Sequence, residues 1–162
     1  MSSIFAQFDA ITSNYLLRAK SAAQEVSKMV LIEIGARLID RSPVGNPALW
    51  KEQPPHPGIN YIPGRFKNNW HLSVDQLSTD IFYASDKTGD AANQRIRAAI
   101  PRFPLGHTYY FNNNLPYAKK LEDGWSSQAP FGMVMLTELE FPQIVRDAEI
   151  RYSNGEKAPN KS

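Results

Sequence analysis

The side chains that could do chemistry in this chain are few and scattered. The three histidines, His56, His71 and His107, lack the regular spacing of a metal site. The chain contains no cysteine, which removes thiolate catalysis, cysteine-ligated zinc and disulfides. The sequence therefore predicts no bound metal.

Paired carboxylates are poorly placed for acid–base catalysis. Glu122 and Asp123 are adjacent, and Glu138 and Glu140 are two residues apart, so the members of each pair point in different directions on a helix. The sequence has no nucleophile elbow, no phosphate-binding glycine loop and no dinucleotide fingerprint. We therefore predict that the protein is not an enzyme and uses no cofactor.

The charge of the chain argues against tight binding of nucleic acid. The formal net charge is +2, and lysine and arginine form no run. Arg95, Arg97 and Arg102 could make a small basic face with Phe103 and Tyr109 nearby, but three arginines are too few to be specific. Nucleic-acid binding is kept as an alternative function.

The length and composition of the chain indicate what kind of fold holds the residues discussed above. A chain of 162 residues with 42% hydrophobic and 11% aromatic residues is long enough for one domain with a core. It contains no apolar run of the roughly 20 residues that cross a membrane, and its N-terminus lacks a signal-peptide pattern. We expect a soluble protein with no membrane partner.

The first segment, from Ile4 to Ile39, carries apolar residues at spacings of three and four, which predicts a helix. An unbroken rod of this length would measure about 54 Å, whereas a compact chain of this size has a radius of gyration of about 15 Å. We expect a break at Thr12-Ser13-Asn14, with Ser13 capping a second helix that runs to about Asp40. The alternative is a protruding rod that packs against a neighbouring subunit.

Prolines and glycines dominate the next segment, residues 43–64. Proline fixes φ and removes a hydrogen-bond donor, so neither a helix nor a central strand can run through this loop. Its apolar residues are many for a solvated linker, and they are Leu49, Trp50, Ile59, Tyr61 and Ile62. We interpret the loop as an arm that orders against a partner; the alternative is a floppy insertion.

Two strands and a helix are predicted beyond the loop. Trp70, Leu72 and Val74 alternate with polar residues as in a half-buried strand, and residues 107–112 suit a second strand. Thr88 or Asp90 is expected to cap a short helix that Pro101 ends.

The C-terminal third is predicted to be mostly helical. A short helical turn over Tyr117–Leu121 is expected to stop at Gly124, and a longer helix from about Gly132 is expected to kink at Pro142. The alternative is that Met133–Phe141 is extended and a new helix begins with Pro142 at its first position. The predicted fold is α+β: a long N-terminal helical segment, a small antiparallel sheet flanked by helices, and the extended proline-rich loop. We expect one domain over residues 1–152 and a disordered tail over 153–162.

A family resemblance is carried by several short motifs in a fixed order. They are Ser42-Pro43-Val44, Pro63-Gly64 with the following Asn69-Trp70, Pro116-Tyr117-Ala118, Leu121-Glu122-Asp123-Gly124, and Gln128-Ala129-Pro130-Phe131-Gly132-Met133-Val134. Together they resemble the tail-component family of tailed phages, which is similar to the minor tail protein Z of lambda-like phages. The resemblance covers about Ile4 to Tyr152. In this chain, residues 45–62 are inserted where the family has a short Asp-Thr-Gly element.

The resemblance implies a structural virion protein of the head–tail junction. Such a neck or tail-completion subunit forms a homo-oligomeric ring that joins the connector to the tail and surrounds the path of the DNA. The implied partners are copies of itself, portal or adaptor proteins, and the tail terminator or tail tube, while genomic DNA passes through without sequence-specific binding. A tail-terminator subunit is the alternative within the same class.

Five residues are predicted to lie at the subunit interface. Buried aromatic residues dominate the energy of protein interfaces, so Trp50, Tyr61, Tyr117 and Trp125 are the expected anchors. Glu122 is the acid expected to be presented with them to the next subunit. The alternative for the loop around Tyr117 and Trp125 is that its apolar side chains fill the core of their own chain.

Overall fold

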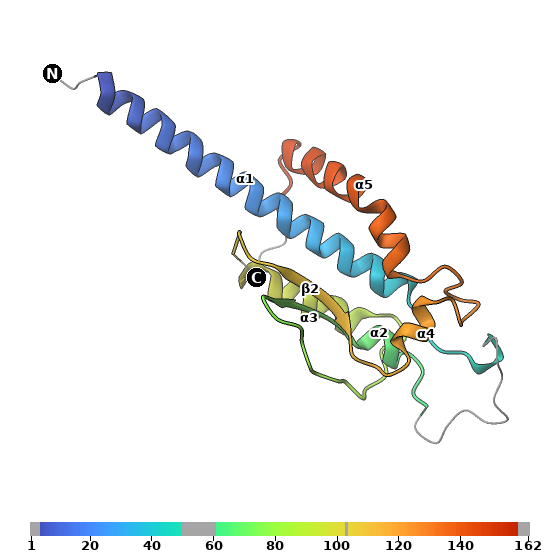
Figure 1. The fold of residues 1–162 in the computed structure, drawn as a ribbon. Coiled ribbons are helices and arrows are strands. Elements are labelled where there is room, and N and C mark those ends of the chain that lie inside the picture. Colours follow the sequence, from blue (N-terminus) through green and yellow to red (C-terminus); the bar gives the residue numbers. More distant parts are fainter. Residues whose placement is uncertain (1–3, 50–60, 103, 159–162) are drawn as a thin grey trace.

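The computed structural model describes residues 4–49, 61–102 and 104–158, and it has the predicted α+β class (Figure 1). Helices and strands follow one another along the chain as α1 Ile4–Arg41, α2 Arg65–Asn68, β1 Trp70–Val74, α3 Asp90–Ala99, β2 Tyr109–Asn113, α4 Ala118–Glu122 and α5 Val134–Ser153. Two 3₁₀ turns, Pro47–Leu49 and Ile100–Arg102, complete the set.

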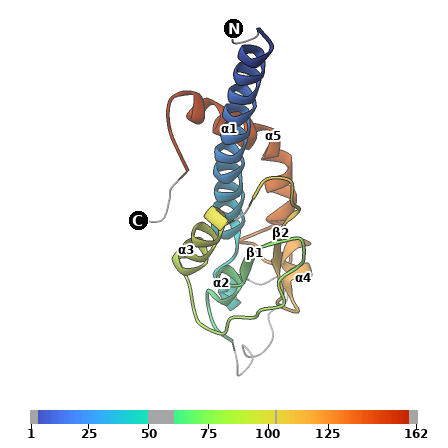
Figure 2. The ribbon, with the colours of Figure 1, turned by 90° about the vertical axis from the view of Figure 1, so that its left-hand side faces the viewer.

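Helix α1 is continuous, so the predicted break at residues 12–14 is wrong. Within a helix, each of these three polar residues is less favourable than alanine by only a few tenths of a kcal/mol. That cost is too small to break a helix whose neighbouring residues are good helix formers. The N-terminal half of α1 projects beyond the rest of the molecule (Figures 1 and 2). On this projecting part, Ile11, Tyr15, Leu16 and Leu17 are between 58% and 71% exposed.

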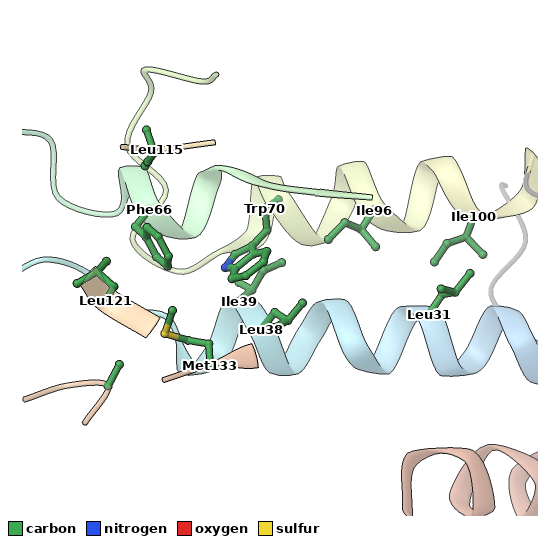
Figure 3. Close-up of a cluster of buried hydrophobic side chains, with 12 residues drawn as sticks. Leu31, Leu38, Ile39, Phe66, Trp70, Ile96, Ile100, Leu115, Leu121 and Met133 are labelled. Carbon is green, nitrogen blue, oxygen red and sulfur yellow. The ribbon is translucent and has the colours of Figure 1, made fainter. Parts of the chain in front are cut away.

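The C-terminal half of α1 lies between two layers (Figures 1 and 2). On one side it packs against α5, through Met29 and Val30 of α1 and Ile144 and Ala148 of α5. On the other side it faces α3 and the sheet. Figure 3 shows this larger cluster, which includes Leu31, Leu38, Ile39, Phe66, Trp70, Ile96, Ile100 and Met133.

Charged side chains also join α1 to α5. The carboxylate of Glu140 accepts hydrogen bonds from Arg37 and Arg41, and the Arg41 Nη2 to Glu140 Oε1 distance is 2.5 Å. The hydrogen bond from Arg41, followed by the positive charge of both arginines, lowers the pKa of Glu140. This ion-pair network fixes how α5 lies along the last turns of α1.

The two predicted strands pair as expected. Strands β1 and β2 are antiparallel, with Trp70 opposite Asn113, Leu72 opposite Phe111 and Val74 opposite Tyr109. The side chain of Trp70 points into the core, where its indole N–H donates to Ser42 Oγ at 2.7 Å. The sheet is thereby tied to the end of α1.

Asparagine side chains hold the segment between β1 and α3, residues 75–86, against the sheet. Asn69 Oδ1 accepts from the Phe82 N–H and Asn69 Nδ2 donates to the Phe82 carbonyl, each at 2.8 Å. Asn112 and Asn114 both donate to the Ser78 carbonyl, at 2.9 and 2.8 Å. These bonds satisfy backbone groups as a third strand would.

The helix after this segment, α3, is capped differently from the prediction. The residue before α3 is Gly89, which has no side chain, and the predicted cap Thr88 accepts, among the described residues, only from the Asp90 N–H, at 3.4 Å. Instead, the buried carboxylate of Asp86 accepts from the N–H groups of Gly89 and Ala92, at 2.9 and 3.0 Å. An acceptor three residues before the cap position fills the same role.

The C-terminal part confirms the long helix and corrects the tail. Helix α5 contains Pro142, as expected, and continues to Ser153. The tail was predicted to be disordered over residues 153–162, but its first part turns back onto α1: Ala158 is 3% exposed, and its N–H donates to Glu25 Oε2 at 3.2 Å. Residues 159–162 lie outside the described part of the chain.

Candidate functional site

An apolar pocket of about 370 Å³ is lined in part by residues of α2 and α4, and these helices lie at the end of the molecule opposite the projecting half of α1 (Figure 1). Four separate stretches of chain form it: the residues after α1, the end of the proline-rich loop, α2, and α4 with its flanks. Its lining consists of Pro43, Val44, Gly45, Tyr61, Ile62, Arg65, Phe66, Pro116, Tyr117, Lys120, Leu121, Trp125 and Ser126.

Three of the five predicted interface residues, Tyr61, Tyr117 and Trp125, meet in this pocket. The Tyr61 hydroxyl donates to the Gly45 carbonyl, which joins the end of the loop to its beginning. The Tyr117 ring packs on Phe66 with a centroid distance of 6.1 Å. Burial raises the pKa of both phenols, so they are neutral over the physiological range.

The position of Trp125 depends on a glycine. Gly124 ends α4 with φ of +76°, and a Cβ there would lie 2.3 Å from the Pro130 carbonyl oxygen. The Trp125 N–H then donates to the Lys120 carbonyl at 3.1 Å. The predicted glycine stop therefore turns the chain so that Trp125 lines the pocket.

Two cations border the pocket, and sequence reasoning did not identify either. Lys120 Nζ lies 5.0 Å from the centre of the Trp125 ring, and the Arg65 guanidinium lies 4.4 Å from that of Tyr83. Among the described lining residues there is no acid. The pocket therefore combines an apolar, aromatic floor with a basic border, which favours partners with apolar and acidic side chains.

Glu122 does not line the pocket but caps α5. Its Oε2 accepts from the N–H groups of Met133 and Val134, at 2.9 and 3.0 Å, and its Oε1 accepts from Met135 at 2.9 Å. A carboxylate at this position satisfies the free N–H groups and the partial positive charge of the first turn. Glu122 lies too far before α5 for any local capping motif to reveal this role.

The fifth predicted interface residue, Trp50, lies outside the described residues, as does half of the proline-rich arm, residues 50–60. The described ends of the arm are anchored on the same part of the molecule. The Leu49 carbonyl accepts from the N–H and the hydroxyl of Ser127, at 3.2 and 2.8 Å. Tyr61, at the other end, lines the pocket.

A second, more polar pocket of about 530 Å³ lies between β1 and residues 76–82. His71 is buried there and stacks on Phe82 with ring centres 5.3 Å apart. Burial, aided by the charge of Arg95 and opposed by Asp80, lowers the pKa of His71. Among the described residues, no group of three histidines or acids could hold a metal ion.

His71 Nε2 and Ser73 Oγ, both on β1, are buried without a hydrogen-bond partner among the described residues. Neither was singled out from the sequence, where His71 was only an isolated histidine on a predicted strand. A neutral histidine and a hydroxyl without a charged partner do not make an activated nucleophile. We therefore place the candidate functional site in the apolar pocket.

Comparisons with known proteins give no indication of the function. No family model matches the chain, and no significant match was found among curated proteins or solved structures. In the part of the chain that is described, no helix combines the length and apolar character needed to cross a bilayer.

Proposed function

We propose that this chain is a structural subunit of the head–tail junction of a tailed phage, a neck or tail-completion protein that assembles into a ring. Its role is to join the connector, made of portal and adaptor proteins, to the tail terminator or tail tube. Genomic DNA passes through the ring without sequence-specific binding. The protein would act in the virion by its shape and its contacts, and the proposal assigns it no catalytic step.

One observation carries this proposal: apolar surface is left uncovered at opposite ends of the molecule. At one end is the pocket formed by Tyr61, Tyr117 and Trp125. At the other end is the exposed half of α1, with Ile11 and Tyr15. About 45 Å of straight helix separates Ile11 from the end of α1, so the two surfaces cannot cover each other within one chain.

Uncovered apolar surfaces at opposite ends favour contacts with neighbouring molecules at both ends. Head-to-tail contacts between subunits use two different patches on each subunit, and they close into a ring when the rotation between neighbours divides a full turn. A surface of this kind, left open in a single chain, is typical of a protein that functions in an assembly.

Two measurements test the proposal. Mass photometry and negative-stain microscopy of the purified chain should show rings, or subunits that add to purified connectors or tails. A phage that lacks the gene should produce separate filled heads and tails. Joined, infectious particles formed without the protein would overturn the proposal.

The pocket itself is tested by a matched pair of variants. Tyr117→Ala removes an aromatic side chain from the pocket, whereas Tyr110→Ala removes one from β2, outside the pocket lining. We expect Tyr117→Ala to reduce head–tail joining in complementation by at least tenfold, and Tyr110→Ala to be close to wild type. Equal behaviour of the two variants would remove the pocket from the joining mechanism.

The alternative, a nucleic-acid-binding protein, makes a different prediction. It requires salt-dependent retention of DNA, because affinity that rests on phosphate contacts falls steeply with salt. A gel-shift titration at low salt that shows no binding would exclude it.

A further inference from the structure

The projecting half of α1 has the features of a helix that is covered by another molecule. Ile11, Tyr15, Leu16 and Leu17 are all exposed, and their spacing places them on more than one side of the helix. A helix that carries apolar residues on several sides is normally buried. In Figures 1 and 2 this part of α1 extends beyond the other described helices and strands.

A second apolar face without a partner lies on the outer side of α5. Met135, Leu139 and Ile150 are 48%, 72% and 57% exposed. The inner side of the same helix is covered by α1 through Ile144 and Ala148. By helical periodicity, the three exposed residues lie on the opposite side, pointing away from α1.

The two surfaces are complementary in charge. Residues 11–24 of α1 contain two basic residues, Arg18 and Lys20, and no acid. Among the described residues, the exposed charged residues of α5 that form no ion pair are three acids and one base: Glu138, Asp147, Glu149 and Arg146. Arg146 lies on the same face as Leu139 and Ile150, between them, so the face as a whole carries two net negative charges. Glu138 and Glu149 are eleven residues apart, about three turns, and therefore flank the same side of the apolar stripe.

The exposed apolar residues of α1, Ile11 to Leu17, span about 9 Å of helix, comparable to the stretch from Met135 to Leu139, about 6 Å. Glu138 lies beside this stretch of α5. In contrast, the apolar pocket is bordered by Arg65 and Lys120, which would repel Arg18 and Lys20. Charge therefore favours the α5 face over the pocket as the surface that receives the projecting helix.

We propose that the projecting half of α1 of one subunit packs on the outer face of α5 of the next subunit. Ile11, Tyr15 and Leu16 cover Met135 and Leu139, and the two basic residues lie beside the acids of α5. This inference rests on the proposed ring and specifies its subunit contact. The apolar pocket then stays open for a different, acidic component of the junction.

The absence of cysteine allows a direct test. Two single-cysteine proteins, Leu16→Cys and Leu139→Cys, are mixed and treated with a short bismaleimide crosslinker. We expect a crosslinked dimer in the mixture and little in either protein alone. The control mixes Leu16→Cys with Gln94→Cys, which is exposed on α3 away from the proposed contact, and should give no dimer.

Charge reversal provides an independent measurement. Arg18→Glu with Lys20→Glu should reduce the oligomer fraction at least tenfold, and Glu138→Lys with Glu149→Lys in the partner should restore it. Arg97→Glu, on the exposed side of α3, serves as the control and should assemble normally.

The outcomes separate this inference from the proposed function. Oligomers that form normally after charge reversal, or a Leu16→Cys protein that crosslinks mainly to itself, would overturn the α1–α5 contact and leave the proposed function intact. A wild-type chain that stays monomeric and never enters a particle would overturn the proposed function itself.

Discussion

The carboxylate of Glu122 offers the sharpest test of how this fold is held together. It is the acceptor for three consecutive N–H groups, those of Met133, Val134 and Met135, at the start of α5. Gly132 makes this approach possible, because a Cβ at that position would lie 2.5 Å from Glu122 Oε1. We predict that Glu122→Ala destabilises the folded chain.

The magnitude follows from the three bonds and their surroundings. Losing a helix N-cap costs about 1–2 kcal/mol, and losing a negative charge at a helix N-terminus adds about 0.3–1 kcal/mol. Val134 and Met135 are exposed, so water partly replaces the lost acceptor. We expect Glu122→Ala to lower the free energy of unfolding by about 2 kcal/mol, and Tm by about 4–8 °C. Glu122→Gln keeps one acceptor oxygen and should lose about 1 kcal/mol.

Urea denaturation followed by circular dichroism measures these differences, with all variants at one protein concentration because assembly stabilises the folded state. Asp123→Ala is the matched control. Asp123 is the next residue and also a carboxylate, but it pairs with Lys119 at the surface, so its loss should cost no more than about 0.5 kcal/mol. If Glu122→Ala and Asp123→Ala are equally stable, the capping role is refuted.

Three further predictions concern single residues. Gly132→Ala, with φ of +74° at that position, should cost at least as much as Glu122→Ala, measured in the same urea titration. Burial and then the charge of Arg95 lower the pKa of His71 in the folded chain. The unfolded chain therefore binds a proton more readily, and the free energy of unfolding decreases as the pH falls below about 6.5. In His71→Phe the decline between about pH 6.5 and 5 should be shallower, as unfolding curves at several pH values would show. Tyr117→Ala should lose about 2–3 kcal/mol, because nearly two-thirds of the side chain is buried; a variant that is unfolded under the assembly conditions would mean that its effect on assembly is a folding defect.

Patterns that repeat along the chain predicted most of the regular elements. The alternation of Trp70, Leu72 and Val74 identified β1, because a half-buried strand requires it. Helix α5 was predicted with Pro142 inside it, and the structure has both. The four-residue helix α2 was missed, because it is too short to show a helical period.

These patterns could not predict contacts between residues that are far apart in the sequence. Asn69 binds Phe82 across 13 positions, and Asn112 binds Ser78 across 34. An asparagine that pairs with backbone in this way looks, in the sequence, like any polar turn residue. The same limit applies to the candidate site: Tyr61, Tyr117 and Trp125 were selected individually for their size, and only the fold shows that they share one pocket.

The continuity of α1 illustrates a different limit. The predicted break rested on the assumption that a chain of this size folds into a compact body, which is a property of proteins that function alone. Nothing in residues 12–14 requires a break, since Thr, Ser and Asn are tolerated within helices at small cost. The mistaken prediction came from the premise of compactness, and the structure instead has the protruding rod.

In this molecule, different residues serve folding and assembly. Asn69, Asp86 and Glu122 each bind backbone N–H groups of a neighbouring segment, and Glu140 joins α5 to α1, so these segments are held in place within one chain. The exposed apolar residues of α1 and α5 are therefore surplus to the core. Because they make little contact with the rest of their own chain, polar substitutions there should change association and leave the free energy of unfolding of the isolated chain within about 0.5 kcal/mol. A variant such as Leu16→Asp that unfolded the monomer would show that the rod belongs to the core, and it would remove the reason to look for a partner on its surface.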